Sequence, residues 1–385
     1  MEKDPLVSII INNYNYGRFL EEAIDSALAQ TYKNIEVIVV DDGSIDNSRE
    51  IIGTYGDKII PVLKENGGQG SAFNAGFKTC KGEYVYFLDA DDMVLPFAAE
   101  YIVNAFCNTN AIKVHWQLQV MNEKSSLTGE LIPADVPPDG NLKDKVLAEG
   151  PFYDWYFTPP TSGNSWRRTF LKQVMPLPEK AFRIGADEYF LTLAPVYGVI
   201  RTLPDQLSWY RIHGNNNCFG NNFDEAYIMS SKDRFEACCI ALHKHFEKFG
   251  IHADIAEWKK KNFNYLWLER LQMARADVGS VIPAGSTLIL IDGNELRENF
   301  TDTCRIKPFM EKNGVFWGLP GDDGDALQEL ERQQKLGADF IAFWWTSFWW
   351  MNQYQEFYKH LVNSFACVLN NDRLIAFDLK RKPVN

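Results

Sequence analysis

Cysteine is scarce in this chain, and its placement excludes two classes of protein. Among 385 residues there are seven Cys, an odd number without Cys-x-x-Cys spacing. A disulfide framework and a structural zinc site both depend on closely spaced or paired cysteines. The sequence therefore predicts a protein of a reducing compartment, with neither of these features.

Long apolar runs and an excess of positive charge are missing as well. The longest apolar stretch, 340–351, is broken by Thr346 and Ser347 and is shorter than the ~18–20 residues of a membrane span. The N-terminus enters a strand at once, which leaves no room for a signal peptide. We therefore expect a cytoplasmic protein, with peripheral contact to the inner face of the membrane as an alternative. The net charge of −12 argues against a nucleic-acid binder.

The familiar phosphate-binding loops are absent too. Residues 67–70 read GGQG, without the Gly-Lys-Ser/Thr ending of a P-loop and without Gly-x-Gly-x-x-Gly. A dinucleotide-dependent oxidoreductase is therefore not indicated. Glycines at these positions instead allow the backbone to approach a ligand closely.

The most informative stretch that is present is 84–92, YVYFLDADD. An apolar run of strand length ends in three carboxylates, Asp89, Asp91 and Asp92. Such groups repel one another unless a cation lies between them, and oxygen ligands favour Mg²⁺ or Mn²⁺. An acidic turn that merely ends a strand is the alternative.

Strands and helices alternate through the first ninety residues. Apolar strands are expected at 6–11, 35–40, 59–63 and 84–88, with helices between them at 18–30, 46–55 and 69–80. This order predicts a doubly wound α/β domain, whose ligands bind outside the carboxyl ends of the strands. Residues 12–15, 41–42 and 89–92 all follow strands and should meet at that edge.

Three regions are expected along the chain: an α/β domain at 1–220, a helical hairpin or linker at 221–280, and a smaller α/β domain at 281–385. A strand is also expected within 113–121. In the last region, residues 321–325 are interpreted as the turn that starts a helix at 324–336. The aromatic run 343–351 is interpreted as the core of a small domain, with a docking surface for a glycan, a membrane or a second subunit as the alternative.

Five motifs in order resemble the N-terminal half of family 2 glycosyltransferases with the GT-A fold. They are VSIIINNYN at 7–15, VVDDGS at 39–44, NGGQGSAFNAG at 66–76, GEY at 82–84 and LDADD at 88–92. The likeness continues more loosely through GADEY at 185–189 and WYRIH at 209–213. The C-terminal region looks like an appended α/β module found behind some bacterial glycosyltransferases.

The resemblance implies a nucleotide-sugar donor (UDP-, GDP- or dTDP-linked), a divalent cation and inverting transfer to a hydroxyl group. It makes Asp91 the main metal ligand, with Asp89 and His213 beside it, and it makes Asp187 the catalytic base, with Glu188 the alternative. The residues that it places around the donor are Asn12, Asn13, Tyr14, Asn15, Asp41, Asp42, Gly68, Gln69, Asn74, Asp89, Ala90 and Arg211.

Two departures from the family pattern affect the donor site. Asn12 and Asn13 stand where the first strand usually runs into Pro-Thr, and Phe73 stands where an Arg often precedes Asn74. A cation for the phosphates or the base would then come from elsewhere, with Lys64 and Arg211 as candidates.

Several alternatives remain open at the level of sequence. Asp187 and Glu188 could simply be an acidic pair at a helix N-terminus, and His213 could be a packing residue. The acceptor could be a glycan, a lipid-linked molecule or a protein, in the synthesis of a surface polysaccharide or glycoconjugate. The main competing function is a non-catalytic relative that binds nucleotide or glycan and assists assembly. Nucleotidyl transfer is disfavoured because only Arg18 lies near the first strand end.

Overall fold

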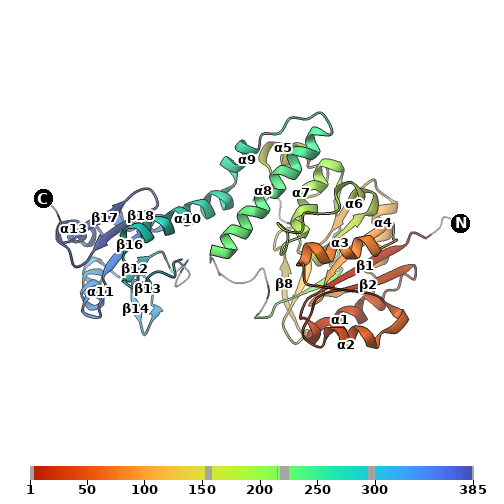
Figure 1. The fold of residues 1–385 in the computed structure, drawn as a ribbon, viewed down its shortest axis with the longest axis horizontal. Helices are drawn as coiled ribbons and strands as arrows, with labels where there is room; N and C mark the ends of the chain where they lie inside the picture. Colours follow the sequence, from red (N-terminus) through yellow and green to blue (C-terminus); the bar gives the residue numbers. More distant parts are fainter. Residues whose placement is uncertain are drawn as a thin grey trace. The chain divides into compact units, whose positions relative to one another are not determined.

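The structure of the chain, a computed structural model, describes residues 4–151, 158–214, 216, 225–293, 296 and 300–383 (Figure 1). The chain divides into two compact units, Met1–Phe219 with Asp233–Asn262 and Gly220–Lys232 with Phe263–Asn385. The helical segment expected at 221–280 divides between them. Each unit contains its own β-sheet, so the predicted α/β fold with a smaller C-terminal α/β domain is confirmed.

The main sheet of the first unit contains the four strands that the apolar runs predict. Among the described residues its strands follow the order β10 (Ile200–Thr202), β6 (Lys113–His115), β9 (Asn164–Arg167), β4 (Tyr84–Asp89), β1 (Val7–Asn13), β2 (Ile35–Asp42) and β3 (Ile60–Lys64). The strands β4, β1, β2 and β3 are parallel, whereas β9 runs antiparallel to β4 and β6. The carboxyl ends of the four parallel strands therefore share one edge.

A second sheet lies beyond the predicted pattern. Its order is β5 (Met93–Val94), β11 (Ser208–Arg211), β7 (Leu118–Met121) and β8 (Leu127–Ile132). The strand expected within 113–121 is two strands, one in each sheet. They part at Trp116, which is fully buried and whose indole donates a hydrogen bond of 2.8 Å to Ser208 Oγ.

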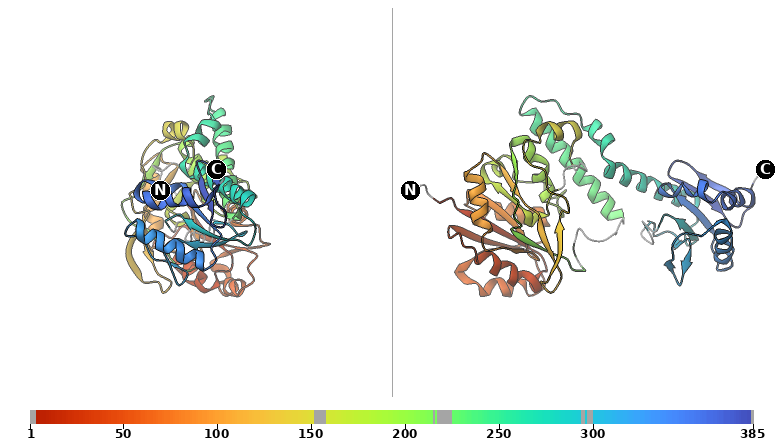
Figure 2. Two further views of the ribbon diagram at one scale, coloured as in Figure 1. Left: turned by 90° about the vertical axis from the view of Figure 1, so that its left-hand side faces the viewer. Right: turned by 180° about the vertical axis from the view of Figure 1, so that it is seen from behind.

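Helices cover both faces of the main sheet (Figures 1 and 2). Ile9 and Ile11 face α1 and α4, whereas Phe87 stacks on Phe73 of α3 and Phe190 of α7. The helices of this unit are α1 (Gly17–Leu28), α2 (Ser48–Thr54), η1 (Gly56–Lys58), α3 (Gln69–Thr79), α4 (Ala98–Cys107), α5 (Lys143–Glu149), η2 (Thr161–Gly163), α6 (Arg168–Val174), α7 (Asp187–Tyr197) and α9 (Ile255–Lys261), while α8 (Glu225–Glu247) extends across the boundary between the units.

The second unit is a three-layer sandwich. Its sheet has the order β13 (Arg305–Pro308), β12 (Thr287–Ile291), β16 (Phe340–Trp344), β18 (Leu374–Asp378) and β17 (Ala366–Asn370), and β14 (Glu311–Lys312) pairs with β15 (Val315–Phe316). One face packs on α10 (Phe263–Val281). The other face packs on α11 (Asp323–Lys335), α12 (Trp350–Gln353) and α13 (Gln355–Ser364), and η4 (Trp345–Ser347) follows β16.

The aromatic run of this unit contributes mainly to its core. Phe343, Trp344 and Trp350 are almost fully buried, whereas 45% of Trp349 is exposed. At the start of α11, the carboxylate of Asp322 accepts a hydrogen bond from the Asp325 amide, so residues 321–325 begin a helix as predicted. In the part of the chain that the structure describes, no helix is long and apolar enough to cross a membrane.

Close contact between α3 and the sheet depends on Gly76. A Cβ atom at this position would lie 2.5 Å from Ile10 Cγ2 and 3.2 Å from Val40 Cγ2. Both neighbours are branched side chains of the sheet, held by buried strands. Any larger residue would therefore push α3 away from β1 and β2.

We predict that Gly76→Ala destabilises the protein, because overpacking a core costs about 1–3 kcal/mol. Gly53→Ala is the matched control, since Gly53 also lies in a helix and a Cβ there would meet nothing within 4 Å. The control should gain up to about 1 kcal/mol from helix propensity. Urea unfolding of the full chain measures both, and equal midpoint shifts in the two variants would contradict this account of the α3 contact.

Candidate functional site

The pairing of β1 with its two neighbours brings the predicted donor residues together. Asn12 lies opposite Asp89 of β4, and Asn13 lies opposite Asp41 of β2. The Asn12 amide donates a hydrogen bond of 2.8 Å to Asp89 Oδ1, and the Asn13 amide donates one of 3.1 Å to Asp41 Oδ1. The three polar clusters named from the sequence thus meet at one edge of the sheet.

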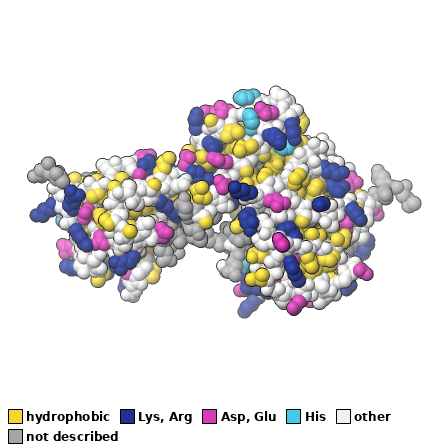
Figure 3. Space-filling view, viewed as in Figure 1, with side chains coloured by type: hydrophobic (Ala, Val, Ile, Leu, Met, Phe, Trp, Pro, Cys, Tyr) yellow, Lys and Arg dark blue, Asp and Glu magenta, His cyan; other side chains and the backbone are white. Residues whose placement is uncertain are grey.

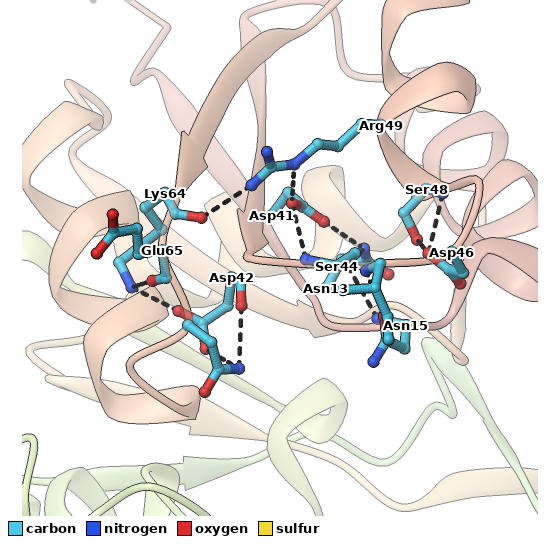
Figure 4. Close-up of polar contacts among 12 residues, drawn as sticks. Asn13, Asn15, Asp41, Asp42, Ser44, Asp46, Ser48, Arg49, Lys64 and Glu65 are labelled. Atoms are coloured by element: carbon cyan, nitrogen blue, oxygen red, sulfur yellow. Dashed lines mark hydrogen bonds and ion pairs between the residues drawn. The ribbon is translucent and has the colours of Figure 1, made fainter.

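Asp41 organises the loop that follows β2 (Figure 4). Its buried carboxylate accepts hydrogen bonds from Asn13, from the Ser44 amide at 3.1 Å and from Arg49 Nε at 2.7 Å. Burial alone would raise the pKa of Asp41, but these hydrogen bonds outweigh it and hold the pKa below its usual value. Asp41 therefore stays ionised and fixes the shape of the loop.

Asp42 anchors the glycine-rich turn before α3. It accepts hydrogen bonds from Lys64 Nζ at 2.5 Å, from the Gly67 amide and from the Gly68 amide at 2.7 Å. Gly68 has φ +89°, and a Cβ there would lie 2.7 Å from Arg183 Cα, so only glycine fits. Lys64, which the sequence offered as a substitute cation, thus pairs with Asp42.

The three carboxylates after β4 have different surroundings. The Asp89 amide donates to Ser162 Oγ at 3.0 Å, and burial together with the charge of Asp91 raises the pKa of Asp89 to about 7. Asp91 Oδ2 lies 3.0 Å from His213 Nε2. Asp92 is buried and accepts a hydrogen bond of 2.9 Å from the Arg211 amide. Asp92 thus shapes the turn, and the roles of Asp89 and Asp91 toward a cation or donor stay predictions.

Arg211 supports the site from within the protein. Its side chain is fully buried, and it donates to the Asp91 carbonyl at 2.7 Å, to Ser125 Oγ at 2.8 Å and to Glu22 Oε2 at 2.9 Å. The guanidinium is therefore engaged by protein groups. Through its hydrogen bond to the Asp91 carbonyl, Arg211 fixes the position of the segment that carries Asp91.

His213 packs in an aromatic pocket beside Asp91. Its ring centroid lies 5.1 Å from that of Phe19 and 5.5 Å from that of Tyr16, and Arg18 Nη2 is 3.4 Å from His213 Nδ1. These contacts leave Nε2 directed at Asp91. The predicted neighbours Asp91 and His213 are thus in contact.

Asp187 lies close to the carboxylate cluster. The Gln69 side chain connects the two, because its Oε1 accepts a hydrogen bond of 3.0 Å from the Ala186 amide and its Nε2 lies 3.5 Å from Asp89 Oδ1. The charge of Asp187 helps to raise the pKa of Asp89, and the Thr161 hydroxyl lowers the pKa of both carboxylates, so Thr161 lies near both. Asp187 is the first residue of α7, and burial raises its pKa.

Glu188 has different neighbours from Asp187. Arg234 Nε donates to its carboxylate at 2.9 Å, and Glu188 lines a cavity of about 150 Å³ with Thr158 and Thr192. Burial raises the pKa of Glu188 to about 7, although the charge of Arg234 lowers it. Of the two candidate bases, Asp187 is the one linked to Asp89.

The remaining predicted donor residues are less closely engaged with this cluster. Tyr14 is 45% exposed, Ala90 is buried, and the side chain of Asn15 accepts a hydrogen bond of 2.8 Å from the Ile45 amide. Asn74 points elsewhere: its amide binds the Leu177 carbonyl at 3.1 Å and the Glu179 carboxylate at 3.0 Å. Their roles toward a donor stay predictions.

Two residues of η2 were missed by sequence reasoning. Thr161 lies near both Asp89 and Asp187 and lowers the pKa of each. The Ser162 hydroxyl accepts a hydrogen bond from the Asp89 amide, and the Ser162 carbonyl accepts from Tyr86 and Ser208. A turn at residues 159–163, PPTSG, could be read from its Pro and Gly content. Nothing local shows that the turn reaches β4, because that contact is made across the sheet.

No group of three or more His, Cys, Asp or Glu side chains among the described residues is arranged to hold a metal ion. Asp91 and Asp89 nevertheless offer the hard oxygen ligands that Mg²⁺ and Mn²⁺ prefer. Mg²⁺ is commonly bound through one or two carboxylates together with substrate phosphates. The two carboxylates would fit such a cation once a diphosphate supplied further oxygens.

Comparisons with known proteins agree with this geometry. The model of the family described as Glycosyl transferase family 2 matches residues 8–134. An uncharacterized glycosyltransferase of Nostoc sp. is 41% identical over 215 residues, which are 55% of this chain and 66% of that protein. One of Rickettsia typhi is 52% identical over 124 residues, 31% of this chain and 39% of that protein. The chain thus spans about two fifths to two thirds of the length of these two relatives.

Among solved structures, Staphylococcus aureus TarS 1–349 in complex with UDP is similar to the chain with a TM-score of 0.48 and 18% identity, covering 72% of this chain and 75% of that one. The family assignment rests on the sequence comparisons, whose matched segment contains the edge residues from Asn12 to Asp92. Through its N-terminal domain, this chain belongs to glycosyl transferase family 2.

Proposed function

We propose that the protein is a metal-dependent, inverting glycosyltransferase that moves a sugar from a nucleotide-sugar donor to a hydroxyl group of an acceptor. The observation that carries the proposal is the connection through Gln69, which joins Asp89 at the end of β4 to Ala186, the residue directly before Asp187 and α7. A donor-binding carboxylate and a candidate base thus adjoin each other at the carboxyl edge of the sheet.

The donor would lie along this edge. We propose that Asn12, Asn13 and Tyr14 contact the nucleoside, with the loop held by Asp41 and the turn held by Asp42 on either side of it. Asp91 and Asp89, with His213 beside Asp91, would hold a divalent cation. When bound, that cation supplies Lewis-acid stabilisation of the negative charge that grows on the leaving diphosphate.

Asp187 would remove the proton from the acceptor hydroxyl during attack on the anomeric carbon. A base must lie within hydrogen-bond reach of that proton and keep an accessible lone pair. Thr161 and the amides at the start of α7 orient the carboxylate. Burial raises its pKa, which makes it a stronger base once it is ionised.

The non-catalytic alternative is less well supported by the geometry. A protein that only binds nucleotide needs the donor edge, but it does not need a second carboxylate joined to that edge. Here Asp91 contacts His213, and Gln69 connects Asp89 to Ala186, directly before Asp187. We therefore favour an active enzyme, acting at the cytoplasmic side in the synthesis of a surface polysaccharide or glycoconjugate, with residues 1–220 as the catalytic domain.

Asp91→Asn should abolish turnover of whichever nucleotide sugar the protein uses, because it removes the main cation ligand. A screen of UDP-, GDP- and dTDP-sugars with Mn²⁺ or Mg²⁺ measures hydrolysis and transfer, and electron paramagnetic resonance measures Mn²⁺ binding. Asp57→Asn, an exposed carboxylate in η1, is the control and should behave as the wild type. Undiminished turnover by Asp91→Asn would remove the metal assignment.

Asp187→Asn should lower transfer by roughly 10²–10⁴-fold, the usual contribution of a general base, while donor binding is retained. The comparison is Glu188→Gln, which should affect transfer much less because Glu188 pairs with Arg234. Calorimetry with the donor nucleotide and single-turnover transfer separate the two effects. If transfer survives in Asp187→Asn and is lost in Glu188→Gln, the base is Glu188.

Thr161→Val keeps the side-chain volume but removes the hydroxyl that lies near Asp89 and Asp187. We expect kcat to fall about tenfold or more with little change in KM for the donor, because hydrogen bonds to charged groups contribute about 1.5–3 kcal/mol. Thr161→Ser keeps the hydroxyl and should restore the rate. Equal rates in the Val and Ser variants would show that the Thr161 hydroxyl does not position the base.

A further inference from the structure

A groove of about 550 Å³ runs along the outer face of α3, between that helix and the segment after α6. Ser71, Asn74, Ala75 and Lys78 line one side at helical spacing, on the face of α3 opposite to Gly76 and the sheet. The groove adjoins the donor edge at Lys64, which binds Asp42, and extends along α3 to Lys78. Its size is that of a small-molecule site.

The walls of the groove combine an apolar surface with positive charge. Phe77, Met175 and Pro176 provide the apolar part, and Lys64, Lys78 and Lys172 provide the charge. Over the face shown in Figure 3, side chains of both signs are interspersed. The chain as a whole has a net charge of −12, yet the groove gathers three lysines and one glutamate, Glu179.

The three lysines differ in their hydrogen bonds and ion pairs. Lys64 binds Asp42 at 2.5 Å and also donates to the Glu65 carbonyl. Lys78 and Lys172 are exposed, and the described part of the chain offers neither of them a hydrogen-bond or ion-pair partner. Glu179 accepts from the Asn74 amide at 3.0 Å, which reduces its capacity to neutralise either lysine. A cleft lined by charge of one sign concentrates ligands of the opposite sign.

We propose that this groove binds a phosphate ester that carries an apolar group. The phosphate would lie between Lys78 and Lys172, where ammonium groups from two different elements can donate to its oxygens. The apolar group would pack on Phe77 and Met175. This site does not depend on the transferase activity, because neither Lys78 nor Lys172 has a role in the donor site or in the proposed transfer.

Phenyl phosphate, which combines both chemical parts, is the probe for the first experiment. Titration into the full-length protein, followed by calorimetry, should show binding that weakens about tenfold in the double variant Lys78→Ala/Lys172→Ala. The matched control is Lys58→Ala/Lys124→Ala, which removes two exposed lysines of the same unit and should bind as the wild type. Lys64 is left intact because it holds Asp42.

Comparing inorganic phosphate, phenyl phosphate and benzyl alcohol tests the two parts of the proposal, and phenyl phosphate should bind most tightly.

A second arm measures sedimentation with phosphatidylcholine vesicles that contain phosphatidylglycerol. Sedimentation that requires Lys78 and Lys172 identifies a lipid headgroup as the source, and its absence alongside phenyl phosphate binding identifies a free ester. No binding of phenyl phosphate at millimolar concentration, or equal weakening in the control variant, overturns the proposal. None of these readouts uses sugar transfer, so a failure of the proposed function would remain distinguishable.

Discussion

The parallel register between β1 and its two neighbours is the constraint on which the site depends. It sets Asn12 against Asp89 and Asn13 against Asp41, so that two strand-end amides each meet a carboxylate. A shift of one residue would turn every side chain of β1 to the opposite face of the sheet. Burial of Ile9 and Ile11 on one face and of Ile10 on the other opposes such a shift. The hydrophobic core and the polar edge are thus fixed by the same pairing.

The carboxylates of the site differ in how far hydrogen-bond donors and cations of the protein compensate their negative charge. Asp41, Asp42 and Asp92 are held by donors from loops and from the neighbouring strand β11, so they maintain shape. Burial raises the pKa of Asp89, Asp92 and Asp187; the charge of Asp91 adds to the increase at Asp89 and Asp92, whereas Lys113 lowers the pKa of Asp187. Uncompensated negative charge is therefore concentrated in the segment that follows β4.

Sequence reasoning predicted the parts of the fold that are local. Apolar runs located the parallel strands, and the turn chemistry of residues 321–325 located the start of α11. It could not place β9, whose antiparallel insertion between β4 and β6 involves residues some 80 positions apart in the chain. For the same reason Asp187 could be named by resemblance, whereas Thr161 could not, because the role of Thr161 arises from a contact between distant segments. Arg211 was named for phosphate, yet burial and its protein partners give it a supporting position.

The placement of α7 has a consequence for how such a domain can diversify. The segment that matches the family, residues 8–134, contains the donor edge but ends before Thr161 and Asp187. In the function proposed above, the donor residues and the base thus reside in successive stretches of one chain, which meet where Gln69 contacts both Asp89 and Ala186. The later stretch could then vary to accept a new molecule while the earlier one keeps its nucleotide, provided that the start of α7 still reaches the end of β4.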